Sequence, residues 1–139
     1  MLMPKPDDAV IARRGEIAEA LRSIVPHHAV IDSAVTLKAY ESDGLTAYRQ
    51  PPMLVVLPDT TAQVSAIMKY AHEEGLKIVP RGAGTSLSGG ALPLADGIVL
   101  GLAKFNRVLD VDFANRCAVV QPGVTNLAIT KAVEHKGFY

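Results

Sequence analysis

The chain has 139 residues, enough for one modest domain with a hydrophobic core. Apolar residues make up 49% and charged residues 20% of it, as in globular rather than disordered proteins. A formal net charge of zero argues against a broad nucleic-acid-binding face, and we see neither a signal peptide nor an apolar run that could span a membrane. A single cysteine, Cys117, excludes an internal disulfide and fits a reducing compartment. Apolar residues alternate around it, so we expect a buried structural thiol.

Helices are expected in the first third of the chain. Residues 1–14 are polar and contain prolines, which predicts an irregular lead-in. A helix ending before Pro26 follows, because apolar residues then recur at helical spacing: Ile17, Ala20, Leu21 and Ile24. Ser33 can cap a second short helix that reaches about Tyr40, and residues 41–52 are irregular.

Residues 53–79 have the pattern of a βαβ unit. A continuous apolar run at 53–57 predicts a strand that is covered on both faces. Thr60 and Gln63 form a capping box at the start of a helix, and Gly75 is placed to end it. The inward stripe of that helix is Val64, Ile67, Met68 and Ala71. Residues 76–79 give a second strand, parallel to the first through a right-handed crossover.

A glycine-rich loop, Pro80–Gly90, follows the second strand. Its eleven residues include four glycines, three hydroxyl side chains and one arginine. Successive N–H groups in such a loop can form a concave nest for an anion, and parallel strands gather ligands at their carboxyl ends. The position and composition of the loop therefore favour pyrophosphate binding over an ordinary flexible connection.

Two familiar phosphate motifs are excluded for this loop. A P-loop needs Gly-Lys-Ser/Thr, and no lysine lies between Lys77 and Lys104. A Rossmann fingerprint needs a third glycine where Leu87 stands, and it opens a helix, whereas Ala91-Leu92-Pro93 follows here.

The last third of the chain predicts a strand at 97–100 and a hairpin. Its strands are 107–112 and 116–121, joined by a turn at 113–115. A helix then begins at Thr125 and stops at Gly137. The adjacent pair His27-His28 reads as exposed loop rather than as a metal site, because neighbouring side chains diverge.

Four blocks of sequence resemble the PCMH-type FAD-binding domain, which has the vanillyl-alcohol oxidase fold. They span 48–58, 78–90, 106–112 and 118–126 and lie in the same order as in the family. The match is nearest to D-2-hydroxyacid dehydrogenases and the FAD-linked D subunits of glycolate oxidases. The resemblance implies an α+β fold, with a parallel βαβ-β subdomain and the beginning of an antiparallel one. Residues 1–47 would be a helical lead-in, and 48–139 the first part of the FAD domain.

The resemblance also implies which residues bind the cofactor. The FAD pyrophosphate is assigned to Pro80, Arg81, Gly82, Ala83, Gly84, Thr85, Ser86 and Gly89. A second wall of the flavin site is assigned to Gln121, Pro122, Gly123 and Val124. Some relatives attach FAD through a histidine near the position of Thr85, and residues 80–90 contain neither His nor Cys, so we expect non-covalent FAD.

The resemblance places catalytic side chains in a later region of the family's chains. We therefore expect an N-terminal fragment with no catalytic or metal-binding residue, inactive alone and binding FAD weakly or not at all. The whole protein would oxidise a small D-2-hydroxy acid such as glycolate or D-lactate, with hydride passing to flavin N5 and electrons to a separate acceptor.

The resemblance also implies companion FAD-binding and iron–sulfur subunits. The protein would then be cytoplasmic, and it would contact a membrane only through such partners. Two alternatives stay open. One is another oxidoreductase of the same fold, such as a reductase of a cell-wall precursor or an aryl-alcohol oxidase. The other is a non-catalytic nucleotide-binding or partner-binding module.

Overall fold

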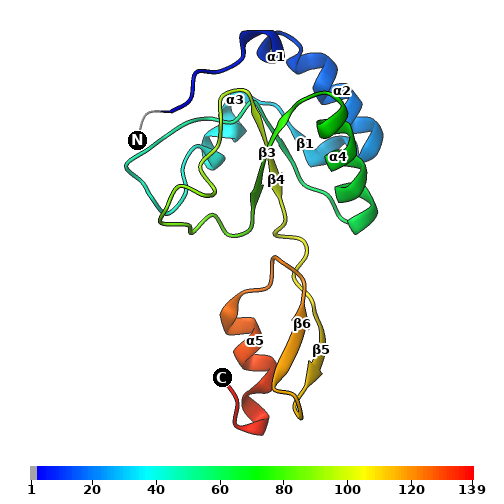
Figure 1. Cartoon of the computed structure of the whole chain (residues 1–139), viewed down its shortest axis with the longest axis vertical. Helices are drawn as coiled ribbons and strands as arrows, with labels where there is room; N and C mark the ends of the chain where they lie inside the picture. Colours follow the sequence, from blue (N-terminus) through cyan, green and yellow to red (C-terminus); the bar gives the residue numbers. More distant parts are fainter. Residues whose placement is uncertain (1–2) are drawn as a thin grey trace.

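A four-stranded sheet organises the larger of two lobes in the computed structural model, which describes residues 3–139 (Figure 1). In sheet order its strands are β1 (Val30–Ile31), β2 (Leu54–Val56), β4 (Gly97–Gly101) and β3 (Lys77–Arg81). β4 is parallel to both of its neighbours, and β1 is antiparallel to β2. Every residue of β2 and β4 is buried, as expected for apolar strands that are covered on both faces.

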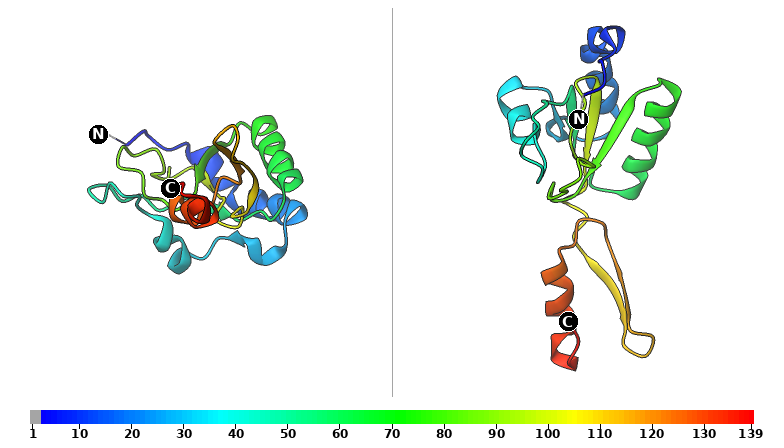
Figure 2. Two further views of the ribbon diagram at one scale, coloured as in Figure 1. Left: turned by 90° about the horizontal axis from the view of Figure 1, so that it is seen from below. Right: turned by 60° about the vertical axis from the view of Figure 1, so that its left-hand side comes forward.

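Helices cover the two faces of this sheet. α2 (Arg14–Ile24) and α4 (Thr61–Glu73) pack on one face, and α3 (Ala34–Leu37) packs on the other. Figure 2 shows this sandwich from the side, with α3 and α4 on opposite sides of the strands. Alternate strand residues serve the two cores: Leu54, Val56, Ile98 and Leu100 on one face, and Val55, Val79 and Val99 on the other.

The βαβ prediction is confirmed, with two corrections. Thr60 Oγ1 accepts a hydrogen bond from the Gln63 N–H, and Gln63 Oε1 accepts one from the Thr60 N–H, so the capping box forms. β2 and β3 are parallel as predicted, but β4 lies between them. Met68 was expected to face inward, but it is 46% exposed. Of the expected inward stripe of α4, only Ile67 and Ala71 are buried.

Two elements near the N-terminus differ from the prediction. α1 (Asp8–Ala12) lies within the segment expected to be irregular, and the Asp7 carboxylate caps it by accepting from the Ala9 N–H at 2.9 Å. β1 was not predicted, because two residues are too few to show an alternating pattern. Short 3-10 helices cover His27–Ala29, Lys38–Tyr40 and Glu134–Lys136. His27 and His28 are exposed, as expected.

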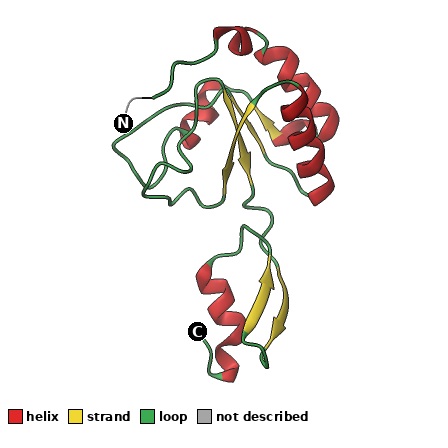
Figure 3. Ribbon diagram, viewed as in Figure 1, coloured by secondary structure: helices red, strands yellow, loops and turns green. Residues whose placement is uncertain are grey.

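The smaller lobe contains the predicted hairpin and final helix (Figure 3). β5 (Val108–Asp112) pairs antiparallel with β6 (Cys117–Val120), and α5 (Asn126–Val133) packs against them. Thr125 caps α5 by accepting from the Ala128 N–H at 3.3 Å. The prediction that Cys117 is buried is wrong: its side chain is exposed, because α5 covers only one face of this two-stranded sheet.

None of the helices within residues 3–139 combines the length and the apolar character needed to cross a membrane.

Asp96 ties the N-terminal segment to the sheet just before β4. Its carboxylate is 2% exposed, and one oxygen, Oδ2, accepts from both the Asp7 N–H and Lys77 Nζ. Burial by itself would raise the pKa of Asp96, but the hydrogen bonds from Lys77 and Asp7 outweigh it and hold the pKa below its ordinary value. The ionised form is therefore the one that the fold stabilises.

We predict that Asp96→Asn lowers the free energy of unfolding by about 1 kcal/mol at neutral pH, because an amide keeps the oxygen but loses the ion pair with half-exposed Lys77. Since the folded pKa is depressed, the carboxylate stabilises the fold above its ordinary pKa and loses that effect as the pH falls through the folded value. Urea denaturation at several pH values should show the difference shrinking in acid. A difference independent of pH would contradict this assignment.

Candidate functional site

The carboxyl ends of the parallel strands meet at the edge of the sheet that faces the smaller lobe (Figure 1). The glycine-rich loop leaves β3 there, and residues 102–107 lead from β4 to β5. A hydrogen bond of 2.8 Å from the Leu102 N–H to the Arg81 carbonyl joins the two connections at their start. The loop predicted to bind pyrophosphate thus lies at the junction of the two lobes.

An open cleft of about 410 Å³ occupies this junction. Gly82 and Ala83 form its wall on the side of the glycine-rich loop, and Gly123–Thr125 and Ala128 form the wall on the side of α5. A β-carbon added to Gly82 would lie 3.8 Å from the Pro122 carbonyl oxygen. The structure therefore brings Gly82 and Ala83 of the first predicted wall close to residues 122–124 of the second, whereas 84–86 and 89 do not line the cleft.

The first half of the glycine-rich loop presents unpaired backbone donors. Within residues 3–139, the N–H groups of 82–86 donate to no protein acceptor. The second half is tied internally, because Ser86 Oγ accepts from the Ser88 N–H at 3.4 Å and the Gly90 N–H at 3.2 Å. Gly89 turns the chain there with a φ of +76°. Of the residues with free donors, Gly82 and Ala83 line the cleft, and 84–86 follow them along the loop.

Arg81 and Gly84 are packed against each other. Gly84 has a φ of +71°, and a β-carbon there would lie 2.4–2.6 Å from atoms of the Arg81 guanidinium. The same guanidinium donates to the Tyr40 carbonyl at 3.1 Å and lies 5.7 Å from the centre of the Tyr40 ring. In this arrangement its charge faces Tyr40, and the prediction that it also binds pyrophosphate stays a prediction.

Pro80 and Arg81 belong to β3, which runs two residues further than the sequence suggested. Pro80 pairs with Leu100 in the register, and β3 is the edge strand of the sheet. An edge strand tolerates proline, because the missing N–H would have faced away from the ladder. Thr85 is exposed beyond the strand, and its hydroxyl is available to a ligand.

The second predicted wall is a tight turn around Gly123. A β-carbon there would lie 2.4 Å from the Leu102 carbonyl oxygen and 2.8 Å from that of Phe105. The side chain of Gln121 bonds within the hairpin, since its oxygen accepts a hydrogen bond from the Arg107 N–H at 3.0 Å. Close packing therefore explains why position 123 is glycine, and it sets Val124 beside the cleft.

Sequence reasoning did not single out two residues of this region. Asn106 lines the cleft with a side-chain amide that can donate and accept hydrogen bonds. The only sign of this role in the sequence is that a polar residue follows Phe105 just before β5. Asp43 is buried beside the glycine-rich loop and is bonded to Ala91, which is 48 residues away. A contact so distant in sequence leaves no local pattern.

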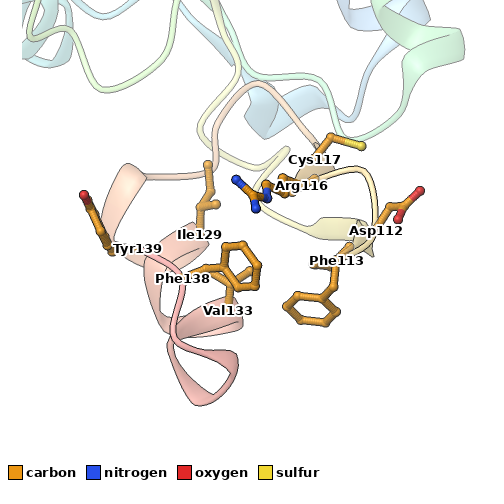
Figure 4. A pocket seen from close by; sticks show the side chains of 10 residues that line it. Asp112, Phe113, Arg116, Cys117, Ile129, Val133, Phe138 and Tyr139 are labelled. Atoms are coloured by element: carbon orange, nitrogen blue, oxygen red, sulfur yellow. The ribbon is translucent and has the colours of Figure 1, made fainter.

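A separate groove of about 150 Å³ lies in the smaller lobe between α5 and the hairpin (Figure 4). Its floor is mostly carbon, from Val111, Ile129, Val133 and Phe138. Phe113 contacts His135 edge-on, with ring centres 5.9 Å apart. A mostly apolar floor does not match the pyrophosphate chemistry proposed for the junction cleft.

The donor set of the junction fits a pyrophosphate. It combines successive free amides, an exposed threonine hydroxyl, and glycines that let a ligand approach the backbone. These donors carry no net charge, so they would hold the anion by directed hydrogen bonds rather than by a cluster of cations.

Comparison with known proteins gives the family. Residues 52–139, more than half of the chain, match the family model described as an FAD binding domain. The chain is 47% identical over 126 residues to the glycolate oxidase subunit GlcD of Escherichia coli K12, covering 91% of this chain and 25% of that protein. It is 30% identical over 123 residues to D-2-hydroxyglutarate dehydrogenase of Stutzerimonas stutzeri, covering 88% and 26%.

The fold also matches solved structures. A structure of p-cresol methylhydroxylase with substrate bound aligns with a TM-score of 0.78 at 20% identity, covering 99% of this chain and 27% of that one. The chain therefore belongs to the family of PCMH-type FAD binding domains, has the expected α+β fold, and takes FAD as its cofactor. It spans about a quarter of the length of the curated relatives it matches.

Proposed function

We propose that residues 80–86 and 89 hold the pyrophosphate of FAD and that residues 121–124 form a second wall of the flavin site. The observation that carries this proposal is the run of free N–H groups at 82–86 beside the junction cleft. In this arrangement Gly82 and Ala83 face the ligand directly, and Gly123 and Val124 close the cleft from the side of α5. Residues 3–47 contribute β1 to the sheet from which the loop projects, and they contribute α2 and α3 to its two faces.

For the whole protein we propose the oxidation of a small 2-hydroxy acid, with glycolate as the first candidate and D-lactate as the second. This rests on the 47% identity to GlcD, compared with 30% to the D-2-hydroxyglutarate enzyme. The oxidation removes a hydride equivalent from C2 and a proton from the hydroxyl group, which leaves the 2-oxo acid. FAD supplies the two-electron acceptor for that hydride.

Residues 3–139 serve this reaction by binding and orienting the cofactor. Among the described residues, no side chain that lines the junction cleft is a carboxylate or a histidine that could take the substrate proton. We propose that this proton acceptor and the substrate site belong to other parts of the whole protein. We also propose companion subunits that pass the electrons on, because GlcD is named as a subunit of glycolate oxidase.

The whole protein should reduce an artificial electron acceptor with glycolate or D-lactate, and with D-2-hydroxyglutarate at least tenfold more slowly. Residues 1–139 alone should show no turnover and weak FAD binding, since the hydrogen bonds of one loop barely offset the entropy of association. A steady-state assay with this panel of 2-hydroxy acids checks the expectation. Faster turnover of an aryl alcohol than of every hydroxy acid would refute the proposed substrate class.

Gly84→Val tests the pyrophosphate loop. The β-carbon would displace the Arg81 guanidinium and disturb the neighbouring free amides, so we expect FAD to bind at least about 30-fold more weakly, as for two lost hydrogen bonds. Gly75→Val is the matched control, because Gly75 also has a positive φ, +65°, but a β-carbon there meets no atom within 4 Å. Flavin titration of the apoproteins measures both, and equal losses of affinity would show that backbone strain alone is responsible.

The absence of histidine and cysteine from residues 80–90 leads us to propose non-covalent FAD. Acid precipitation of the purified whole protein should leave all of the flavin absorbance in the supernatant. Yellow colour that stays with the precipitate and survives washing would show a covalent bond to the protein.

A further inference from the structure

A short segment, residues 40–45, packs against the glycine-rich loop but does not line the junction cleft. The two long loops, 41–53 and 82–96, lie together beside the sheet in Figures 1 and 3. Three separate contacts join this segment to the loop, and they involve Asp43, Gly44 and Tyr40. We call residues 40–45 the brace segment.

Asp43 makes the most informative of these contacts. The residue is 5% exposed, yet within residues 3–139 its carboxylate forms no ion pair. Instead, Oδ1 accepts from the Leu45 N–H at 2.9 Å, and Oδ2 accepts from the Ala91 N–H at 3.4 Å. A buried carboxylate is costly unless it is hydrogen-bonded, so its two backbone donors are what keep it in place.

The other two contacts fix the same loop at different points. Gly44 lies so close that an added β-carbon would be 2.8 Å from the carbonyl oxygens of both Thr85 and Ser86. Arg81, where the loop begins, donates to the Tyr40 carbonyl at 3.1 Å. The brace segment therefore contacts the start and the middle of the loop and the residue directly after its end.

We propose that Asp43 is a positioning residue for FAD binding, which holds the glycine-rich loop in the conformation that leaves the amides of 82–86 free. The inference rests on the proposed role of that loop. A loop with four glycines loses much conformational freedom when it binds a ligand. By bonding the Ala91 amide, Asp43 imposes part of that order in advance, which favours binding.

Asp43→Asn and Asp96→Asn form a matched pair for the test, since both replace a buried carboxylate with an amide. Both donors to Asp96 bond to the same oxygen, Oδ2, and an asparagine retains one oxygen that can accept from both. The two donors to Asp43 bond to different oxygens, and an asparagine retains only one of them. In the whole protein, Asp43→Asn should raise the Kd for FAD at least tenfold, and Asp96→Asn less than twofold. Titration of each apoprotein with FAD measures the two values.

Hydrogen exchange with mass spectrometry provides a second readout, which does not depend on measuring FAD affinity. In the wild-type apoprotein, peptides covering 43–45 and 89–91 should be protected before FAD is added, and Asp43→Asn should speed exchange in both. Gly44→Ala is the second variant, to be used if Asp43→Asn does not fold. Its β-carbon would clash with the Thr85 and Ser86 carbonyl oxygens, so it should also weaken FAD binding.

Two results would overturn the inference while leaving the proposed function intact. One is that Asp43→Asn binds FAD as tightly as the wild type does. The other is a wild-type apoprotein in which 43–45 and 89–91 are unprotected although the strands of the sheet are protected. Unchanged FAD binding by Gly84→Val would instead overturn the proposed role of the loop, and the inference about Asp43 with it.

Discussion

The burial of β4 between β2 and β3 determines where everything else in the larger lobe can lie. Its five residues are buried, and both of its edges are paired to parallel strands. Parallel pairing brings the carboxyl ends of β2, β3 and β4 to one edge, and β4 itself leads from that edge into the smaller lobe. The glycine-rich loop and the turn at Gly123 meet as a consequence, although about forty residues separate them.

At that edge the loop satisfies two opposite requirements. A phosphate nest needs backbone donors with no protein partner, whereas a loop rich in glycine needs protein contacts to stay ordered. The structure divides the loop accordingly. Among the described residues, the amides of 82–86 have no protein acceptor, whereas those of Ser88, Gly90 and, directly after the loop, Ala91 are bonded. Ser86 and Asp43 supply the acceptors for the bonded half.

The family match and the geometry concern different parts of the functional question. Membership of the FAD binding domain family gives the cofactor, and the free amides of the junction cleft suggest where its pyrophosphate lies. The proposal that the whole protein oxidises a 2-hydroxy acid rests only on the similarity of this chain to longer relatives. The chain spans about a quarter of their length. The proposed role of residues 3–139 is therefore cofactor binding, and the proposed substrate site belongs to the whole protein.

Local signals in the sequence determined the capping box at Thr60, the hairpin around residues 113–115 and the glycine-rich loop, because each depends on neighbours within a few positions. The resemblance to the PCMH type correctly gave the family, the α+β fold and the cofactor. Only the tertiary structure decided the place of β4 in the sheet, the exposure of Met68 and Cys117, and the partners of Arg81 and Asp43. Those features depend on which surfaces other elements cover and on contacts 41 and 48 residues apart, and neither periodicity nor turn chemistry encodes such contacts.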